Sequence, residues 1–418
     1  MTKSIVIIIG GGFGGLNAAK ALKKANVDIL LIDKMNYHLF QPLLYEVATA
    51  ALSPGEIATP LREILRNQEN VSVIMGEVAD INTTQKQVIL SNQAWFGYDY
   101  LIIATGARHS YFGNDQWEAF APGLKTIPDA LNIREQILIS FEKAERADFG
   151  SILPYLTFVI IGGGPTGVEM AGAIAEIAYK TMFKNFRKIN PEKAQIFLIE
   201  ACPNILPSYP ERLSKRAKKD LEKLGVQVLN NIKVTNIDNS GVQIADTFIA
   251  SKNIIWAAGN QASKLLSRLN TPLDRAGRVI VEPDLTLSNF PEVFIIGDAA
   301  HVENNNKLLP GIAPVAIQQG RYVAKTITQE LDKKNRKPFK YFDKGSMATI
   351  GKAKAIAFIG KLQFTGFIAW LMWAFIHLVY LIGFRDRFIV LIEWVVALIS
   401  GKRGVRLIYS RSIDETKE

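Results

Sequence analysis

The chain has 418 residues, of which 48% are hydrophobic and 21% charged, enough apolar material for two or three folded domains and too much for a disordered protein. A single cysteine, Cys202, excludes an internal disulfide and every redox mechanism that needs a cysteine pair. The net charge of +10 lies in one block, because residues 333–418 carry 16 Lys and Arg against 6 Asp and Glu. This basic excess indicates an anionic partner, a membrane or a nucleic acid, for the C-terminal region alone.

The first motif is a glycine loop that follows an apolar strand. The run Ile5–Ile9 is typical of a strand buried in a parallel sheet and is too short for a secretory signal, so we expect folding in the cytoplasm or an equivalent compartment. The loop after it reads G-x-G-x-x-G at Gly10, Gly12 and Gly15. Such glycines make a tight turn, let the backbone approach a pyrophosphate and let helix and strand pack closely. The next strand, 27–32, ends in Asp33, placed to bind a ribose hydroxyl, and the whole unit predicts dinucleotide binding.

The same unit occurs a second time. An apolar strand at 157–161 leads into a second G-x-G-x-x-G loop, with its glycines at Gly162, Gly164 and Gly167. The strand that follows the helix ends in Glu200, which would accept hydrogen bonds from a ribose 2′-hydroxyl and repel a 2′-phosphate. We therefore expect a preference for NAD(H) over NADP(H), with an ordinary acid at a strand end as the alternative interpretation of Glu200.

Three shorter signatures accompany the loops. Ala-Thr-Gly at 104–106 and Ala-Ala-Gly at 257–259 each follow an apolar strand, and a third strand runs into Gly297 and Asp298. The Asp298 carboxylate would then lie against a polyol chain. Two dinucleotide folds in one chain indicate a diffusible nicotinamide and a resident cofactor, for which a flavin is the natural choice.

With these motifs in this order, the sequence resembles the two-dinucleotide-binding-domain flavoproteins, and among them the type II NADH dehydrogenases, which are single-subunit, non-proton-pumping NADH:quinone oxidoreductases. The resemblance covers almost the whole chain. It implies an α/β fold with two Rossmann-like domains, FAD at the first loop and NADH at the second. It also implies hydride transfer from NADH to FAD, followed by transfer of two electrons to a membrane quinone.

The cofactor contacts implied by this resemblance come from both loops, the acids, the short signatures and a segment at 36–45 expected beside the flavin. They are Gly10, Gly12, Phe13, Gly14, Gly15, Asp33, Lys34, Tyr45, Thr105, Gly106, Gly162, Gly164, Pro165, Thr166, Gly167, Glu169, Glu200, Ala258, Gly259, Gly297, Asp298 and Ala316.

The stretch 309–320 resembles the quinone-side helix of the family. Many members carry A-Q-x-x-x-Q there, but this chain has Pro314 where the first glutamine stands, and proline has no side-chain hydrogen-bond donor. The expected quinone-binding residues are Pro314, Ile317, Gln318 and Gln319. Gln318 and Glu169 are the expected catalytic residues. The alternative for the quinone-side residues is that they are ordinary polar residues at a helix surface. The alternative for Glu169 is an acid that is favoured at a helix N-terminus.

The few histidines and the single cysteine limit the other kinds of chemistry that the chain could perform. The four histidines, His38, His109, His301 and His377, lack metal-ligand spacing, so we expect no metal site. Disulfide reductases and sulfide:quinone oxidoreductases of the same superfamily need reactive cysteines, which the single Cys202 does not provide, and we interpret Cys202 as structural.

The C-terminal region predicts membrane association. Residues 364–384 form a run of 21 residues without Asp, Glu, Lys or Arg, and basic residues flank the apolar region on both sides. These symmetric flanks favour a monotopic anchor in the membrane interface, with Trp370, Trp373 and Trp394 at the headgroup level. A single crossing and a buried dimerisation helix are the alternatives, and no nucleic-acid-binding module is recognisable. The resemblance adds a homodimer, and we expect the cytoplasmic face of an energy-transducing membrane.

The expected domain order follows from these motifs. It is residues 1–112 for FAD, 113–153 as a connection, 154–273 for NAD(H), 274–332 for the second part of the FAD domain with the quinone-side helix, and 333–418 for membrane association. Two other functions stay open, a soluble NADH-dependent reductase of a protein electron acceptor and a nicotinamide-responsive flavin-binding regulatory protein.

Overall fold

The computed structural model describes residues 3–304, 307–329 and 336–408 and divides the chain into two compact units. Unit 1 comprises residues 1–39, 58–108 and 260–343, and unit 2 comprises residues 40–57, 109–259 and 344–418. Each unit is built on one large, mainly parallel sheet with helices, which confirms the expected α/β fold with two Rossmann-like domains. The short segment 40–57 belongs to unit 2, because its helix α2 (Leu44–Ala48) contacts α4 (Ile127–Arg146) and α6 (Pro165–Glu176).

Unit 1 is built on a six-stranded sheet with the strand order β20-β21-β9-β1-β2-β5. All neighbours are parallel except β20, which runs antiparallel to β21. The central strand β1 is buried from Val6 to Ile9, as its unbroken apolar run predicts. The strands are β1 (Ser4–Ile9), β2 (Val27–Asp33), β5 (Val71–Met75), β9 (Tyr100–Ile103), β20 (Thr286–Leu287) and β21 (Phe290–Ile295).

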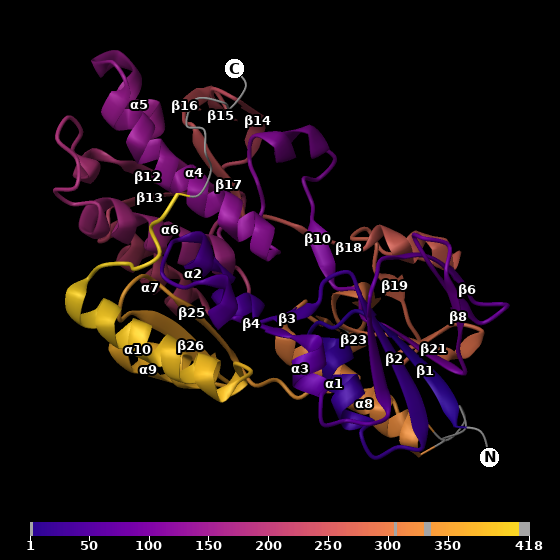
Figure 1. Ribbon diagram of the computed structural model, residues 1–418. Helices are drawn as coiled ribbons and strands as arrows, with labels where there is room; N and C mark the ends of the chain where they lie inside the picture. The colour runs from indigo at the N-terminus through magenta and orange to yellow at the C-terminus, as the bar shows by residue number, and fades with distance from the viewer. Residues whose placement is uncertain (1–2, 305–306, 330–335, 409–418) are drawn as a thin grey trace. The chain divides into compact units, whose positions relative to one another are not determined.

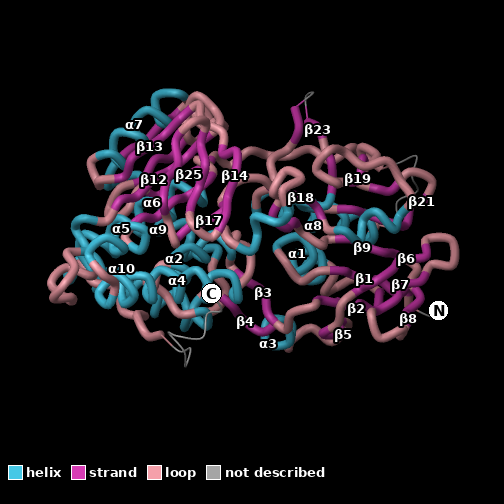
Figure 2. The backbone as a smooth tube through the Cα atoms, turned by 90° about the horizontal axis from the view of Figure 1, so that it is seen from above, coloured by secondary structure: helices cyan, strands magenta, loops and turns pink. Residues whose placement is uncertain are grey.

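Helices α1 (Phe13–Ala21) and α8 (Ala313–Thr328) lie side by side next to β1 and β9 (Figure 2). Their close approach depends on glycine, because a Cβ on Gly320 of α8 would lie 2.3 Å from the carbonyl oxygen of Gly14. The other elements of unit 1 are α3 (Leu61–Leu65), β3 (Tyr37–Leu39), β4 (Ala58–Pro60), β6 (Val78–Asn82), β7 (Gln87–Leu90), β8 (Trp95–Gly97), β19 (Val279–Ile280), β22 (Ala300–His301), β23 (Glu303–Asn304) and β24 (Lys307–Leu308). Strands β10 (Ala107–His109) and β18 (Asn260–Ala262) lie where the chain passes between the units.

Unit 2 is built on a four-stranded parallel sheet with the order β13-β12-β11-β17. Helix α6 packs on this sheet and continues as one π-helical turn at Ile177–Thr181. Its strands and remaining helices are β11 (Thr157–Ile161), β12 (Gln195–Glu200), β13 (Val226–Asn230), β17 (Asn253–Trp256), α5 (Ile152–Tyr155) and α7 (Glu211–Glu222). A separate antiparallel sheet consists of β14 (Val234–Asp238), β15 (Gly241–Ile244) and β16 (Thr247–Ala250).

The C-terminal part of unit 2 is a three-stranded antiparallel sheet followed by two helices, drawn in yellow beside β25 and β26 (Figure 1). The elements are β25 (Ser346–Thr349), β26 (Ala355–Ile359), β27 (Leu362–Thr365), α9 (Gly366–Tyr380) and α10 (Phe384–Ser400). The apolar run 364–384 is therefore divided, with Gly383 at a φ of +94° in the turn between α9 and α10. Within the described ranges, every helix falls short of the length or hydropathy needed to span a bilayer.

Candidate functional site

The first glycine loop, in unit 1, leaves space where a cofactor phosphate would approach. Gly10 has a φ of +102°, and its N–H donates to the carbonyl of Ile32 at 2.8 Å. A Cβ on Gly15 would lie only 1.9 Å from the Gly10 oxygen, whereas a Cβ on Gly12 would have nothing within 4 Å. The loop thus has no room for a side chain at Gly15, where it packs against the helix, and free space at Gly12. This free space lies at the N-terminus of α1 and fits the pyrophosphate of a dinucleotide.

The second loop, in unit 2, repeats this geometry. Gly162 has a φ of +111°, and its N–H donates to the carbonyl of Ile199 at 2.8 Å. A Cβ on Gly167 would lie 1.8 Å from the Gly162 oxygen, and a Cβ on Gly164 would again have nothing within 4 Å. Pro165 lies in the first turn of α6, where its missing N–H costs no hydrogen bond. The residues of this loop therefore also fit a dinucleotide.

The acid at the end of each strand accepts a hydrogen bond from the glycine loop of the same unit. The Gly11 N–H donates to Asp33 Oδ2 and the Gly163 N–H donates to Glu200 Oε2, both at 2.6 Å. The second oxygen accepts from the backbone as well, from Met35 N–H for Asp33 and from Cys202 N–H for Glu200, both at 2.7 Å. The sequence indicated these acids as ribose ligands but not as supports of the glycine loops. A carboxylate oxygen has two lone pairs, so the loop contact leaves room for a ribose hydroxyl.

Four further expected residues of unit 1 follow the ends of β9 and β21. The buried hydroxyl oxygen of Thr105 makes no hydrogen bond within the described part of the chain, which fits a group that awaits a polar ligand. Gly106 has a φ of +66°, and a Cβ there would have nothing within 4 Å. Gly297, with a φ of +68°, donates its N–H to Gln319 Oε1 at 2.6 Å, and Asp298 follows it directly.

The other expected cofactor residues take different places. Phe13 packs edge-on against His38, with ring centroids 5.1 Å apart, and Gly14 faces Ile296 and α8. In unit 2, Gly259 has a φ of +69° and lies against Phe112 and the Ser110 carbonyl. Of the rest, Lys34 and Pro165 are exposed, Thr166, Ala258 and Ala316 are half-buried, and Tyr45 is buried in unit 2.

The expected quinone-side residues on α8 are largely engaged by their own unit. Gln318 Nε2 donates to the carbonyl of Phe342 at 2.9 Å, and its Oε1 accepts from the Phe342 N–H at 3.0 Å. Gln319 is buried and holds the Gly297 N–H, and Ile317 is buried beside it. Pro314 lies in the first turn of α8. Helical spacing places Gln318 and Gln319 on adjoining faces, so Gln319 acts here as a support of the loop at Gly297.

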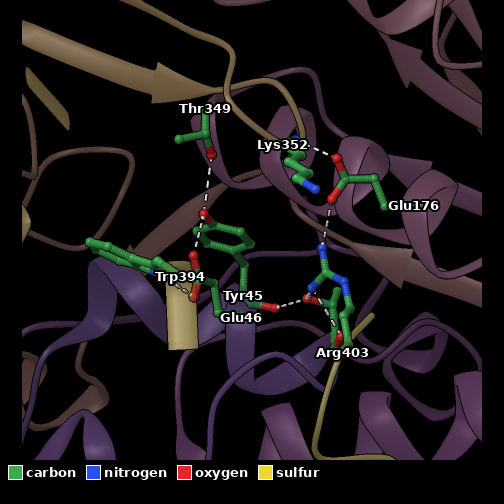
Figure 3. A network of polar contacts seen from close by, with 8 residues as sticks. Tyr45, Glu46, Glu176, Thr349, Lys352, Trp394 and Arg403 are labelled. Atoms are coloured by element: carbon green, nitrogen blue, oxygen red, sulfur yellow. Dashed lines mark hydrogen bonds and ion pairs between the residues drawn. The ribbon is translucent and has the colours of Figure 1, made fainter. Parts of the chain in front are cut away.

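Unit 2 contains a cavity lined by acids, a tyrosine and tryptophans (Figure 3). Glu169, which lies beyond the first turn of α6, accepts the Thr349 N–H at 3.4 Å. The Tyr45 hydroxyl lies 3.1 Å from Glu46 Oε1 and 3.1 Å from Thr349 Oγ1. The lining also includes Ala51, Ala173, Glu176, Lys180, Gly351, Lys352, Ala353, Trp370, Trp394, Ala397, Leu398, Gly401, Lys402 and Arg403. The sequence indicated Glu169 and Tyr45 but missed Glu46 and Thr349, although an acid inside the apolar stretch 42–52 is itself a signal of a buried carboxyl.

Burial dominates the electrostatics of this cavity. It raises the pKa of Glu169 to about 8, against the lowering effect of the Thr349 N–H, and the nearby Glu46 raises it further. Burial also raises the pKa of Glu46, although the Trp394 indole N–H, which donates to Glu46 Oε2 at 2.9 Å, opposes the shift. Both carboxyls therefore hold protons at a pH where an exposed glutamate has lost its own.

Arg403, which follows α10, also lines this cavity. Arg403 Nη1 donates to the carbonyl and the hydroxyl of Thr49, at 3.0 and 2.7 Å, and its Nη2 lies 3.1 Å from Glu176 Oε2 (Figure 3). The Lys352 N–H donates to the other oxygen of Glu176. Glu176 is the last residue of α6 before the π-helical turn, a feature often found at functional sites.

Two of the three tryptophans expected at a membrane surface are buried. Trp373 is 1% exposed and Trp394 7% exposed, with ring centroids 5.0 Å apart, so these two stabilise the packing of α9 on α10. That expectation was wrong for both, because each faces the interior of unit 2. Exposed apolar side chains nevertheless cover the other faces of the two helices: Phe367, Ile368, Leu371, Phe375, Val379, Phe384, Phe388, Leu391, Ile392, Val395, Val396 and Ile399.

Cys202 is exposed on the loop after β12. A hydrogen bond to Glu200 raises the pKa of the thiol, and burial and the charge of that acid raise it further. A raised pKa disfavours the thiolate, which is the form that attacks disulfides and sulfide-derived sulfur.

Comparisons with known families match this arrangement over most of the chain. Residues 4–320 match the pyridine nucleotide-disulphide oxidoreductase family, and residues 344–403 match the NDH2 C-terminal domain. Two Mycobacterium tuberculosis proteins are similar over nearly their full length. The type II NADH:quinone oxidoreductase Ndh is 48% identical over 96% of this chain and 89% of its own. The type II NADH:quinone oxidoreductase NdhA is 47% identical over 98% of this chain and 90% of its own.

The fold is also similar to a solved structure. NDH2 from Plasmodium falciparum, in a complex with NADH, superposes with a TM-score of 0.87 over 96% of this chain and 99% of its own, at 23% sequence identity. At this identity the likeness concerns the fold.

Proposed function

The chain belongs to the type II NADH:quinone oxidoreductase family, and from this membership we propose that it oxidises NADH through a bound FAD and reduces a membrane quinone without pumping protons. The observation that carries the proposal is the pair of glycine loops with matching geometry, one in each unit, in a chain with a single cysteine. Two dinucleotide sites provide for a resident and a diffusible cofactor, and the electrons need an acceptor other than a cysteine pair.

For FAD, we assign the loop of unit 1. The glycines at its start would hold the pyrophosphate, Asp33 the ribose, and Asp298 the ribityl chain, with the unpaired Thr105 hydroxyl as a further donor. When bound, FAD accepts a hydride and passes on two electrons. The protein supplies orientation and fixed charges.

For NADH, we assign the loop of unit 2. Gly164 leaves the phosphates room at the N-terminus of α6, and Glu200 would accept the ribose 2′-hydroxyl. A 2′-phosphate would meet the Glu200 carboxylate, which is held in place by the Gly163 N–H, so NADPH is expected to bind more weakly.

For the quinone, we assign Glu169 as the acid that protonates the reduced ring, and Gln318 as a residue that binds it. Burial keeps the Glu169 carboxyl protonated near neutral pH, which suits a general acid. Gln318 would have to exchange its contact with Phe342 for one with the quinone, because both of its polar groups are occupied. Pro314, Ile317 and Gln319 would contribute to the shape of the quinone site without a hydrogen bond to the quinone. The side chain of Gln319 already accepts the Gly297 N–H.

The membrane contact is assigned to the exposed apolar residues of α9 and α10. These two helices present apolar side chains such as Phe367, Phe375, Phe384 and Ile399 to the surface, in a region whose sequence is strongly basic. Such a surface suits a monotopic protein at a bilayer with anionic lipids. We place the protein on the cytoplasmic face of the membrane, as a homodimer.

The test follows the flavin absorbance without oxygen. We expect NADH to bleach the flavin of the detergent-purified protein, NADPH to bleach it much less, and a soluble quinone analogue to restore the colour quickly. Bleaching without recovery would replace the quinone by a protein acceptor. A protein purified without any flavin would contradict the assignment.

A further inference from the structure

We propose that Glu46 is a proton reservoir for quinone reduction, and that it delivers its proton through the hydroxyls of Tyr45 and Thr349 to the cavity lined by Glu169. This inference rests on the proposed function and adds residues of α2 and β25 to it. All four residues belong to unit 2.

The hydroxyl groups form a continuous chain from Glu46 (Figure 3). The Tyr45 hydroxyl lies 3.1 Å from Glu46 Oε1 on one side and 3.1 Å from Thr349 Oγ1 on the other. A hydroxyl donates one hydrogen bond and accepts others, so this chain has two directions. With Glu46 ionised, Thr349 donates to Tyr45 and Tyr45 donates to Glu46. With Glu46 protonated, each donor becomes an acceptor, and this reversal is what proton transfer along the chain requires.

The chain of hydroxyls ends beside Glu169. The Thr349 N–H donates to Glu169 Oε1 at 3.4 Å, so the residue that supplies the last hydroxyl also contacts the proposed acid. Tyr45, Glu46, Glu169 and Thr349 all line the same cavity. A proton that leaves the Thr349 hydroxyl therefore enters the space into which Glu169 faces.

The surroundings of Glu46 suit a group that stores a proton. Glu46 is 7% exposed, and its Oε2 accepts from a neutral donor, the indole N–H of Trp394. The guanidinium of Arg403 is directed at Thr49 and Glu176 instead. Burial raises the pKa of Glu46, against the lowering effects of the Trp394 hydrogen bond, the charge of Arg403 and the Tyr45 hydrogen bond, and the carboxylate of Glu176 adds to the rise. The charged groups that line the cavity around it are Glu169, Glu176, Lys180, Lys352, Lys402 and Arg403.

The proposed reaction consumes one proton per turnover, which such a reservoir would supply. Quinone and NADH with one proton give quinol and NAD⁺, so the hydride equivalent accounts for two electrons and one of the two quinol protons. The Glu169 O–H bond breaks to form the second quinol O–H bond. Glu46 then loses its proton to Tyr45, Tyr45 loses its own to Thr349, and the Thr349 proton passes across the cavity to the Glu169 carboxylate. Water finally returns one proton to Glu46.

The test separates the two half-reactions by rapid mixing. Glu46→Gln, Tyr45→Phe and Thr349→Val should slow flavin reoxidation by quinone by about tenfold or more, since positioned proton transfer contributes about 10²- to 10⁴-fold. Flavin reduction by NADH should keep its wild-type rate in Glu46→Gln and Thr349→Val. Thr349→Ser keeps the hydroxyl and should reoxidise close to the wild-type rate. Tyr111→Phe, which removes a hydroxyl bound to the Ala121 carbonyl outside the cavity, is the matched control.

A second readout does not depend on turnover. Above the ordinary pKa of glutamate, the oxidised enzyme should show an infrared carbonyl band of protonated carboxyls that loses one component in Glu46→Gln, and deuterium oxide should slow reoxidation more in Tyr45→Phe than in the wild type. Equal reoxidation rates for Thr349→Val and Thr349→Ser, or the absence of that component, would overturn the relay. If Glu46→Gln loses its flavin, the two Thr349 variants decide. A wild-type enzyme that does not reduce quinone at all would instead contradict the proposed function.

Discussion

The two glycine loops share a backbone and differ in the acid that supports them. In unit 1 the carboxylate after the second strand is Asp33, and in unit 2 it is the longer Glu200, yet each accepts a glycine N–H of its own loop at 2.6 Å. The same hydrogen bond is thus reached from side chains that differ by one methylene. The loop geometry is a property of the backbone and its glycines, and the acid is free to differ with the ligand.

A second difference lies two residues after the last glycine of each loop. In α1 this position is Asn17, whose amide donates to the Phe13 carbonyl at 2.9 Å within the same helix. In α6 it is Glu169, which accepts the N–H of Thr349 from a strand far along the chain. The first loop is therefore followed by a neutral amide, whose oxygen also accepts from Arg321 of α8 at 3.3 Å, and the second by an acid that lines a cavity.

The largest effect on stability is expected at the last glycine of each loop, where a side chain has no room. A methyl group on Gly15 or Gly167 would lie 1.9 or 1.8 Å from a carbonyl oxygen, so Gly15→Ala and Gly167→Ala should each lower the free energy of unfolding by about 3 kcal/mol or more. The cofactor losses should differ. Gly15→Ala should purify with little flavin, and Gly167→Ala should keep flavin that NADH no longer bleaches. Thermal unfolding and the ratio of flavin to protein measure both effects.

The middle glycines provide the control for this prediction. Gly12→Ala and Gly164→Ala add the same methyl group where nothing lies within 4 Å, so their unfolding midpoints should stay close to that of the wild type. Their cofactor affinity should fall, because the methyl group occupies the approach of the phosphates. If all four variants unfold alike, the close contacts do not govern the loops.

A smaller effect is expected at the two acids. Glu200→Gln removes the charge that opposes a 2′-phosphate, so the preference for NADH over NADPH in kcat/KM should fall by about tenfold, or about 1.4 kcal/mol. Asp33→Asn makes the matching change in unit 1 and should lower the flavin content while the nicotinamide preference stays as in the wild type. An unchanged preference in Glu200→Gln would show that this acid supports the loop and does not select the ribose.

The loops and the acids were accessible from the sequence because they are local features. A turn, a close contact and a strand end each lie within a few residues of the glycines, so spacing alone indicated them. The cavity was not accessible in the same way, because Glu46 precedes Thr349 and Arg403 by about 300 residues or more and only the folded chain brings them together. The orientation of Gln319 was also missed, since it depends on the packing of α8 on α1 through Gly320.

The smallest effect concerns the pH dependence of stability at Glu169, the acid that has a neutral counterpart in the first loop. Burial raises the pKa of Glu169 from its ordinary value of 4.5 to about 8. Between these two pH values the folded protein holds a proton that the unfolded chain has released. Because the folded state binds more protons there, this group makes the free energy of unfolding fall as the pH rises, and the effect stops above about pH 8.

The glutamine side chain in Glu169→Gln cannot ionise, so the decrease in the free energy of unfolding that Glu169 causes at rising pH should disappear. Relative to the wild type, the variant should become more stable from pH 5 to pH 8, by about 1 kcal/mol or more, and the difference should be constant above that range. Urea unfolding at a series of pH values measures it. Glu211→Gln, at an exposed acid of α7 paired with Lys215, should show no such trend, because the pKa of Glu211 is lowered and the group is ionised throughout. Parallel stability curves for Glu169→Gln and the wild type would mean that Glu169 is ionised in the folded protein. The contrast with Asn17 would then be one of shape and not of protonation.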